Sequence, residues 1–301
     1  MKKYLLVATM AFYFGTSVAQ QNKVGQQTPK EPTAEELYNE AIKHLRGEDG
    51  MFIDSIKAIN LFIESGNMGY APSQYETSQY FFNKDNPSYA LEWLIKSVKQ
   101  DYIPAIEYYW SYNSNIGNIN EANKWLRKGA ELGYPKFQWF LGYNFHYGED
   151  GFPVNSTQAI FWLEKAANQN QPDAAYELGE MYLNIHPDIV KRDIQKAVYW
   201  LKKASDLGDS NAQYSLALMY EHGEGVDIDK EMAFKLMKKS ASSGNARAQH
   251  NLGAMFVDGI GCQKNIDSAK YWFKLAFENE NADEETKESA RHNMKILIAN
   301  Y

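Results

Sequence analysis

The chain has 301 residues, of which 44% are hydrophobic and 23% charged, and its formal net charge is −7 at pH 7. A mean hydropathy of −0.56 excludes a protein with many membrane spans. The acidic balance argues against a nucleic-acid binder, because phosphate contacts need a basic face. The chain's single cysteine excludes an internal disulfide and a thiolate zinc cage.

The first 19 residues have the layout of a secretory signal peptide. Lys2 and Lys3 precede the apolar run Tyr4–Phe14, and small residues (Ser17 and Ala19) stand at −3 and −1 of the expected cut. The run is too short for a membrane-spanning helix, which needs about 20 apolar residues. We expect cleavage after Ala19 and a periplasmic or secreted protein. The alternative is a buried first helix.

Residues 20–34 are rich in Gln, Lys and Pro and predict a flexible linker. Thr33 and Glu36 have the spacing of a capping box, so we expect folded sequence to begin there.

A repeated pattern fills residues 35–281. Its register is marked by seven alanines at intervals of 32, 32, 37, 38, 36 and 36 residues: Ala58, Ala90, Ala122, Ala159, Ala197, Ala233 and Ala269. Three positions after the marks stand Leu61, Trp93, Trp125, Trp162, Trp200, Leu236 and Trp272. Five of the seven tryptophans therefore share one slot, which indicates a structural repeat.

The same register contains helix boundaries. Asp or Asn, the side chains that cap a first helical turn, stands four positions before each alanine: Asp54, Asn86, Asn118, Asn155, Asp193, Asp229 and Asn265. Eleven positions after the alanines stand Gly69, Asp101, Gly133, Asn170, Gly208, Gly244 and Glu280. Gly and Asn favour the left-handed conformation that ends a helix, so each unit predicts a helix of about four turns.

Each of these capped helices is followed by another helix. Its core stripe has i, i+4, i+8 spacing and begins at Ser73, Ala105, Phe137, Ala174, Ala212 and Ala248. Glycine-rich segments at 148–151, 223–226 and 259–261 then predict turns between helices rather than phosphate cradles, because no strand leads into them. Residues 282–301 complete the chain as a predicted capping helix, with Ala290, Met294, Leu297 and Ile298 at helical spacing.

Residues 174–182 (AAYELGEMY) resemble the first helix of the Sel-one-like repeat, a relative of the tetratricopeptide repeat, and residues 193–208 resemble its second helix. The resemblance covers roughly residues 37–277. It implies an all-α fold, a right-handed α-α superhelical solenoid of about seven helix-turn-helix repeats. A hairpin of this size must stack on its neighbours to bury its apolar face. The resemblance also implies an adaptor that holds other proteins together.

Catalytic and metal-binding motifs are missing from the sequence. The six histidines form neither an HExxH motif nor an i, i+4 pair, and we expect them to be solvated or capping: His44, His146, His186, His222, His250 and His292. The sequence also contains no GxSxG elbow and no SxxK. We therefore expect no enzyme, no cofactor and no metal site. Cys262 is interpreted as a partly buried spectator, and the alternative is a redox or dimer-forming thiol.

Variable slots on the predicted concave face are the candidates for binding a protein or peptide partner. They hold Tyr108, Tyr112, Phe140, Tyr143, Glu177 and Glu180. Tyrosine supplies a large contact area at low entropic cost and is enriched at binding hot spots. The alternative is that irregular early repeats use these rings as core.

The leading hypothesis is an exported, non-enzymatic interaction scaffold, monomeric, with no nucleic-acid partner and no membrane span. A second hypothesis is a periplasmic inhibitor or immunity-type protein that sequesters a toxic enzyme. A third is a cell-envelope hydrolase, since some secreted cysteine-rich relatives of the family have been linked to β-lactam binding or hydrolysis. Those relatives carry a cysteine pair in each repeat, and this chain has none.

Overall fold

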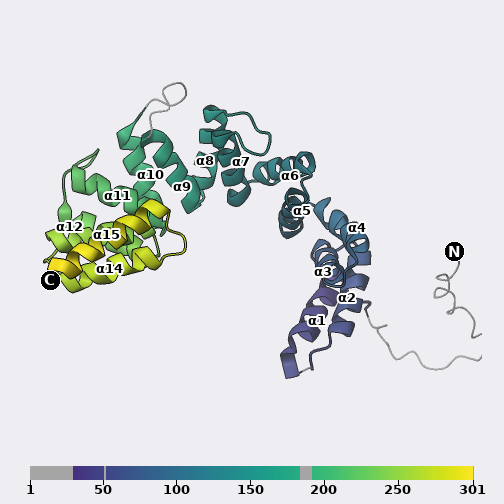
Figure 1. Ribbon diagram of the computed structural model, residues 1–301. Coiled ribbons are helices and arrows are strands. Elements are labelled where there is room, and N and C mark those ends of the chain that lie inside the picture. Colours follow the sequence, from purple (N-terminus) through teal and green to yellow (C-terminus); the bar gives the residue numbers. More distant parts are fainter. Residues whose placement is uncertain (1–29, 51, 184–191, 301) are drawn as a thin grey trace, which may run out of the picture. The chain divides into compact units, whose positions relative to one another are not determined.

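The structure is a computed structural model that describes residues 30–50, 52–183 and 192–300. The predicted signal peptide and most of the predicted linker lie outside these residues, as does His186. In the described ranges the regular structure consists of fifteen α-helices and one 3-10 helix, with no strand, which confirms the all-α prediction. The helices are α1 (Ala34–Arg46), η1 (Glu48–Gly50), α2 (Ser55–Asn67), α3 (Ala71–Phe82), α4 (Pro87–Val98), α5 (Ile103–Asn115), α6 (Ile119–Glu131), α7 (Pro135–Tyr147), α8 (Ser156–Asn168), α9 (Pro172–Leu183), α10 (Ile194–Asp206), α11 (Ser210–His222), α12 (Lys230–Ser242), α13 (Ala246–Asp258), α14 (Ile266–Glu278) and α15 (Glu284–Asn300) (Figure 1).

The chain divides into two compact units, Met1–Ser73 and Gln74–Tyr301. In the first unit, α1 and α2 form a hairpin whose interior contains Leu37, Ala41, Ala58, Ile59 and Phe62. The Ser65 hydroxyl closes one end of this hairpin by donating to the carbonyl of Ala34 at 2.6 Å. The predicted capping box at Thr33 and Glu36 is present at the start of α1.

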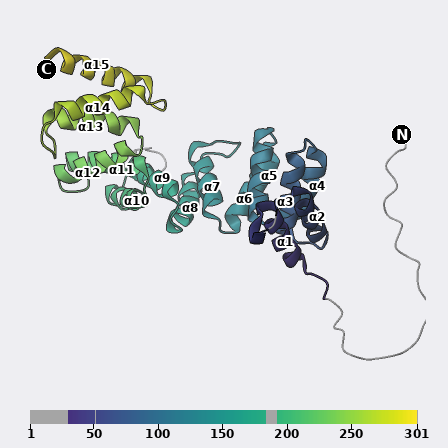
Figure 2. The same cartoon turned by 90° about the horizontal axis from the view of Figure 1, so that it is seen from below.

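The second unit is a series of hairpins in chain order. The pairs α7–α8, α9–α10, α11–α12 and α13–α14 each pack closely, and each pair also contacts the next helix along the chain. Figure 2 shows α13, α14 and α15 layered one on another at the C-terminal end. One core cluster runs through the helices from α4 to α11, and smaller clusters continue it to α15.

Six of the seven predicted Asx caps are confirmed. In each, the side-chain oxygen accepts a hydrogen bond from a backbone N–H in the first turn: Asp54, Asn86, Asn155, Asp193, Asp229 and Asn265. The prediction for Asn118 is wrong, because its amide donates instead to Oδ1 of the buried Asn113, at 3.0 Å. A neighbouring buried amide thus takes the side chain away from the helix end.

Helix endings follow the predicted pattern with one exception. Positive φ angles occur at Gly69, Asp101, Gly133, Asn170, Gly208 and Gly244. Glu280 does not adopt this conformation, because α14 ends at Glu278 and the next residue, Asn279, is already in extended backbone with φ −70°. The predicted glycine turns are confirmed, with positive φ at Gly148, Gly151, Gly223, Gly225, Gly259 and Gly261.

Glycines on the first helices allow close contact with the second helices. A Cβ on Gly179 would lie 2.6 Å from Cγ of Leu201, and one on Gly253 would lie 2.8 Å from Cδ1 of Phe273. Alanine occupies this slot at Ala217, where the residue opposite is the unbranched Met237 in the same core cluster. The pairing indicates that a flexible thioether accommodates the extra methyl group, whereas a branched or aromatic side chain needs glycine.

Side-chain amides connect neighbouring repeats by the same device twice. At the end of α8, Gln169 Nε2 donates to the Gly133 carbonyl at 2.8 Å, and after α14 Asn279 Nδ2 donates to the Gly244 carbonyl at 2.8 Å. Each amide also donates to a buried glutamine in the preceding first helix, Gln138 or Gln249. The junction is therefore held by hydrogen bonds to main chain as well as by apolar packing.

Candidate functional site

In the second unit α9 contacts both α7 and α11, the first helices of the neighbouring repeats, and α13 contacts α15. Side-chain pairs join them in turn: Lys136 with Glu107, Tyr147 with Glu177, Ser215 with Glu180, Asn251 with Tyr214, and Asn293 with His250. We call the surface that these helices (α5, α7, α9, α11, α13) and α15 form the first-helix face. The six binding residues predicted from the sequence lie on three of these helices, α5, α7 and α9.

Three of the predicted binding residues pack against other rings. The Tyr108 and Tyr112 rings lie 5.2 and 5.7 Å from that of Phe82, and the Phe140 ring lies 4.7 Å from that of Trp110. Tyr108 and Phe140 also pack against the buried core cluster. These contacts agree with the alternative that the early repeats use these rings for packing, and a binding role for the three stays a prediction.

The other three predicted residues form a patch with two tyrosines that the prediction left out. The Tyr143 and Tyr147 rings are in tilted contact with centroids 4.5 Å apart, and the Tyr147 hydroxyl donates to Oε2 of Glu177 at 3.2 Å. Glu180 accepts a hydrogen bond from the hydroxyl of Ser215 at 3.1 Å. Tyr176 directly precedes Glu177 in sequence. We call this set, Tyr143, Tyr147, Tyr176, Glu177 and Glu180, the tyrosine–carboxylate patch.

The electrostatics of the patch are those of crowded, partly desolvated carboxylates. Burial is the main cause that raises the pKa of Glu177 to about 7, and the charges of Glu180, Asp173 and Asp209 add to it. The hydrogen bond from Tyr147 opposes this shift. At neutral pH the Glu177 carboxyl is therefore shared between its protonated and charged forms.

The two patch tyrosines nearest Glu177 respond in the same direction. Burial, followed by nearby carboxylates, raises the pKa of Tyr147 and of Tyr176 well above the ordinary tyrosine value. Both hydroxyls are thus neutral donors at physiological pH, and neither can act as a phenolate nucleophile or base.

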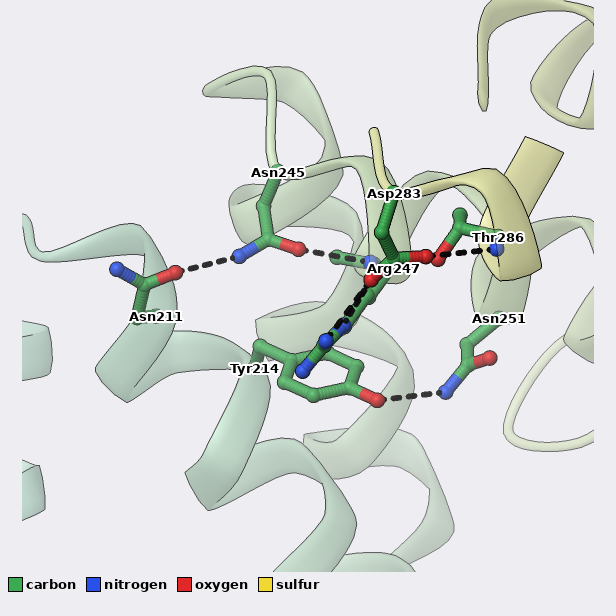
Figure 3. Close-up of polar contacts among 8 residues, drawn as sticks. Asn211, Tyr214, Asn245, Arg247, Asn251, Asp283 and Thr286 are labelled. Carbon is green, nitrogen blue, oxygen red and sulfur yellow. Dashed lines mark hydrogen bonds and ion pairs between the residues drawn. The ribbon is translucent and has the colours of Figure 1, made fainter. Parts of the chain in front are cut away.

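A second polar surface lies between α11, α13 and α15 (Figure 3). It contains two adjoining hollows of about 450 and 410 Å³ that share Arg247, Asp283 and Thr286. Arg247 donates from Nη2 and Nε to one carboxylate oxygen of Asp283, at 2.9 and 3.3 Å. The other oxygen accepts the backbone N–H of Thr286 at 2.7 Å. Hydrogen bonds from Thr286 and Arg247 lower the pKa of Asp283 to about 2.

Asparagines line the rim of this second surface. Asn245 donates to Asn211 at 2.9 Å and accepts from the backbone N–H of Ala248, so it links two helix starts. Asn251 donates to the hydroxyl of Tyr214 at 3.4 Å (Figure 3). This surface is polar and carries charges of both signs.

The candidates predicted from the sequence do not include Tyr147, Tyr176, Tyr214, Arg247 or Asp283. Tyr147 stands four residues after Tyr143 and so continues its helical stripe, a signal that was available. The predicted candidates also leave out the slot directly before the first core residue of each first helix. In the first two units this slot holds Pro72 and Pro104. In the last four it holds Lys136, Asp173, Asn211 and Arg247, and each of these four acts on a residue of the first-helix face.

The described ranges also bear on a metal site, a membrane-spanning helix and a reactive thiol. They contain no group of three or more His, Cys, Asp or Glu side chains that could hold a metal ion, and no helix long and apolar enough to cross a bilayer. Burial raises the pKa of the half-buried Cys262, which disfavours a reactive thiolate and agrees with the spectator interpretation. His44 departs from the expectation of solvated histidines, since it is buried in α1 with Nε2 3.3 Å from Glu40.

Comparison with known proteins places these features in a family. The Sel1 repeat matches seven segments: residues 34–70, 72–102, 113–134, 135–171, 172–209, 210–245 and 246–281. A chitin synthase regulator of Saccharomyces cerevisiae, SKT5, is 27% identical over 141 residues, which is 43% of this chain but only 20% of that protein.

Two solved structures share the fold. A Sel1 repeat protein from Oxalobacter formigenes superposes with a TM-score of 0.59 at 23% identity, covering 88% of this chain and 87% of that one. A protective antigen of uropathogenic Escherichia coli superposes with a TM-score of 0.53 at 22% identity, covering 89% and 69%. With seven repeats matched along most of its length, the chain belongs to the Sel1 repeat family, and its fold is a helical repeat solenoid.

Proposed function

We propose that the chain is a non-enzymatic scaffold that binds a protein or peptide partner on the first-helix face. One observation carries the proposal: this face combines tyrosines, carboxylates, an arginine and asparagines from successive helices in one surface, and two hollows open on it. Aromatic and arginine side chains are the usual anchors of protein interfaces, and Asn supplies adaptable hydrogen bonds. Repeat proteins commonly bind along such extended surfaces.

The proposal includes export. The charged start, the short apolar run and the small residues before the expected cut support cleavage after Ala19. Intact-mass analysis of the protein recovered from the periplasm or medium tests it. A mass equal to the chain from Gln20 onward is expected, whereas full-length protein confined to the cytoplasm contradicts export.

The binding proposal is tested with the mature protein as bait. Captured proteins are identified by mass spectrometry, and the leading candidate is then purified and titrated by calorimetry against three proteins: wild type, Glu177→Lys and Glu131→Lys. Glu131 is an exposed residue of the second helix α6, so its reversal is the matched control.

We expect the reversal at Glu177 to weaken binding at least tenfold and the reversal at Glu131 to leave it within about twofold. A loss of affinity with Glu131→Lys as large as that with Glu177→Lys, or no saturable binding by any captured protein, contradicts the proposal. A captured toxic enzyme whose activity is lost on binding supports the inhibitor hypothesis within the same surface. Hydrolysis of cell-wall substrates or β-lactams by the purified chain supports the third hypothesis and overturns the scaffold.

A further inference from the structure

The distribution of charge along the first-helix face is uneven. Glu107 is paired with Lys136 at one end of it, and Asp283 is paired with Arg247 at the other. Between these pairs, Glu177 receives a hydrogen bond from the neutral Tyr147. The charged groups that act on it are all carboxylates: Glu180, Asp173 and Asp209.

Among the described residues, the neighbouring helices place further tyrosines and carboxylates around Glu177. From α7 come Tyr143 and Tyr147, and Glu149 beyond it acts on Tyr143. Asp209, which caps α11, has its pKa raised by burial and by the charge of Asp173. In the part of the chain that the structure describes, no Lys or Arg forms an ion pair with Glu177. A partner protein could therefore supply the positively charged side chain that pairs with Glu177.

The tyrosine rings beside the carboxylates indicate which cationic side chain of a partner fits the patch. The rings of Tyr143 and Tyr147 are in tilted contact, and Tyr147 remains 49% exposed. A guanidinium or ammonium group gains from lying on a tyrosine face, and a carboxylate within hydrogen-bonding distance strengthens that contact in a partly desolvated site. The planar guanidinium can stack and donate two parallel hydrogen bonds at once, so arginine fits better than lysine.

We propose that the tyrosine–carboxylate patch binds a basic segment of the partner protein, with an arginine side chain placed against Tyr147 and Glu177. The inference rests on the proposed function and adds the chemistry of the partner. It assigns recognition to the stretch from α7 to the start of α11, where the face carries tyrosine rings beside Glu177, a carboxylate that forms no ion pair with a described Lys or Arg.

A pH dependence follows from the same geometry. With a pKa of about 7, Glu177 must lose its proton before it can pair with a cation, and an arriving cation favours that loss. Affinity for a basic peptide therefore rises between pH 6 and pH 8, by a factor that approaches ten per pH unit below the pKa of Glu177. Replacement of Glu177 by Gln removes this dependence.

The experiment uses the mature protein and fluorescein-labelled peptides of alternating arginine and glycine, with lysine, citrulline and glutamate versions in place of arginine. Anisotropy titrations at pH 6, 7 and 8 compare wild type, Glu177→Gln, Tyr147→Leu and the control Glu131→Gln. Circular dichroism melts establish that each variant is folded, and Glu177→Gln keeps an acceptor for the Tyr147 hydroxyl.

We expect the arginine peptide to bind at least tenfold more tightly than the citrulline peptide. Glu177→Gln and Tyr147→Leu each lower its affinity about tenfold, and Glu131→Gln changes it less than twofold. Equal losses for both Gln variants reveal attraction to net negative charge only and overturn the inference. Equal binding of the arginine and citrulline peptides overturns it as well.

The outcome is separable from that of the proposed function. If the captured partner loses affinity with Arg247→Met but not with Glu177→Gln, the scaffold stands and the patch assignment falls. If the arginine peptide binds at the patch but no protein partner does, the patch chemistry stands and the scaffold falls.

Discussion

Replacement of Gly179 by Ala tests the packing logic of the repeat. In an exposed helix interior this change stabilises by about 1 kcal/mol, since alanine has the higher helix propensity. Here the new Cβ would lie 2.6 and 2.7 Å from Cγ and Cδ2 of Leu201, which is fully buried. These are the branch point and a methyl group of a packed side chain, so the contact cannot be relieved by moving a flexible end.

The magnitude follows from the two opposing effects. Overpacking of a well-packed core costs about 1–3 kcal/mol, and the closeness of the branch carbon favours the upper half of that range. After the gain in helix propensity is subtracted, we expect Gly179→Ala to lower the free energy of unfolding by about 1–2 kcal/mol. For a chain of this size the corresponding fall in Tm is roughly 2–8 °C.

The structure also offers a rescue. The equivalent pair in the next repeat is Ala217 and Met237, so Gly179→Ala combined with Leu201→Met reproduces a combination the fold already contains. Thermal melts followed by circular dichroism, with Leu201→Met alone as control, complete a double-mutant cycle. We expect the double variant to recover at least half of the loss. A single variant with a higher Tm than wild type, or a coupling energy of zero, refutes the close-contact argument.

Further predictions concern the core, the patch and the cap. Trp200→Ala creates a cavity at a side chain that is 7% exposed and should cost about 3–5 kcal/mol in urea unfolding, whereas Tyr199→Ala, 58% exposed, should stay within about 0.5 kcal/mol. The pKa of Glu177 is raised on folding, so its contribution to stability is fully present below about pH 4.5 and is lost as pH rises through about 7. Glu177→Gln should flatten that part of a stability–pH curve, and an unchanged curve contradicts the assigned shift. Asp283→Ala removes the acceptor for the Thr286 N–H and should destabilise the first turn of α15, measured as faster amide exchange there, while Glu284→Ala should leave exchange unaltered.

The repeat architecture was predictable because its signals are local. The Asx caps and left-handed helix ends depend on backbone hydrogen bonds within one turn, so their residue types appear directly in the sequence. Buried alanines such as Ala174 and Ala212 were found from periodicity alone. The failed prediction for Asn118 has the opposite origin. Its side chain donates to the buried amide of Asn113, a contact that the spacing of capping residues does not reveal.

The candidate site was predictable only in part. Helical spacing placed Tyr143, Glu177 and Glu180 on one surface, but it could not show that Tyr108 and Phe140 pack against the core, because exposure at a variable slot depends on neighbouring repeats. Arg247 and Asp283 are 36 residues apart, and their pairing depends on how α15 follows α13. Such a pair has no signature within either helix.

The amides of Gln169 and Asn279 donate to carbonyls of the preceding repeat, not to particular side chains there. A junction of this kind accepts any neighbour whose backbone makes the same left-handed ending, whatever residues its helices carry. Duplication or loss of one whole hairpin would therefore preserve the hydrogen bonds that connect the repeats on either side of it. Such a chain can change length and exchange recognition residues in evolution without redesign of the joints.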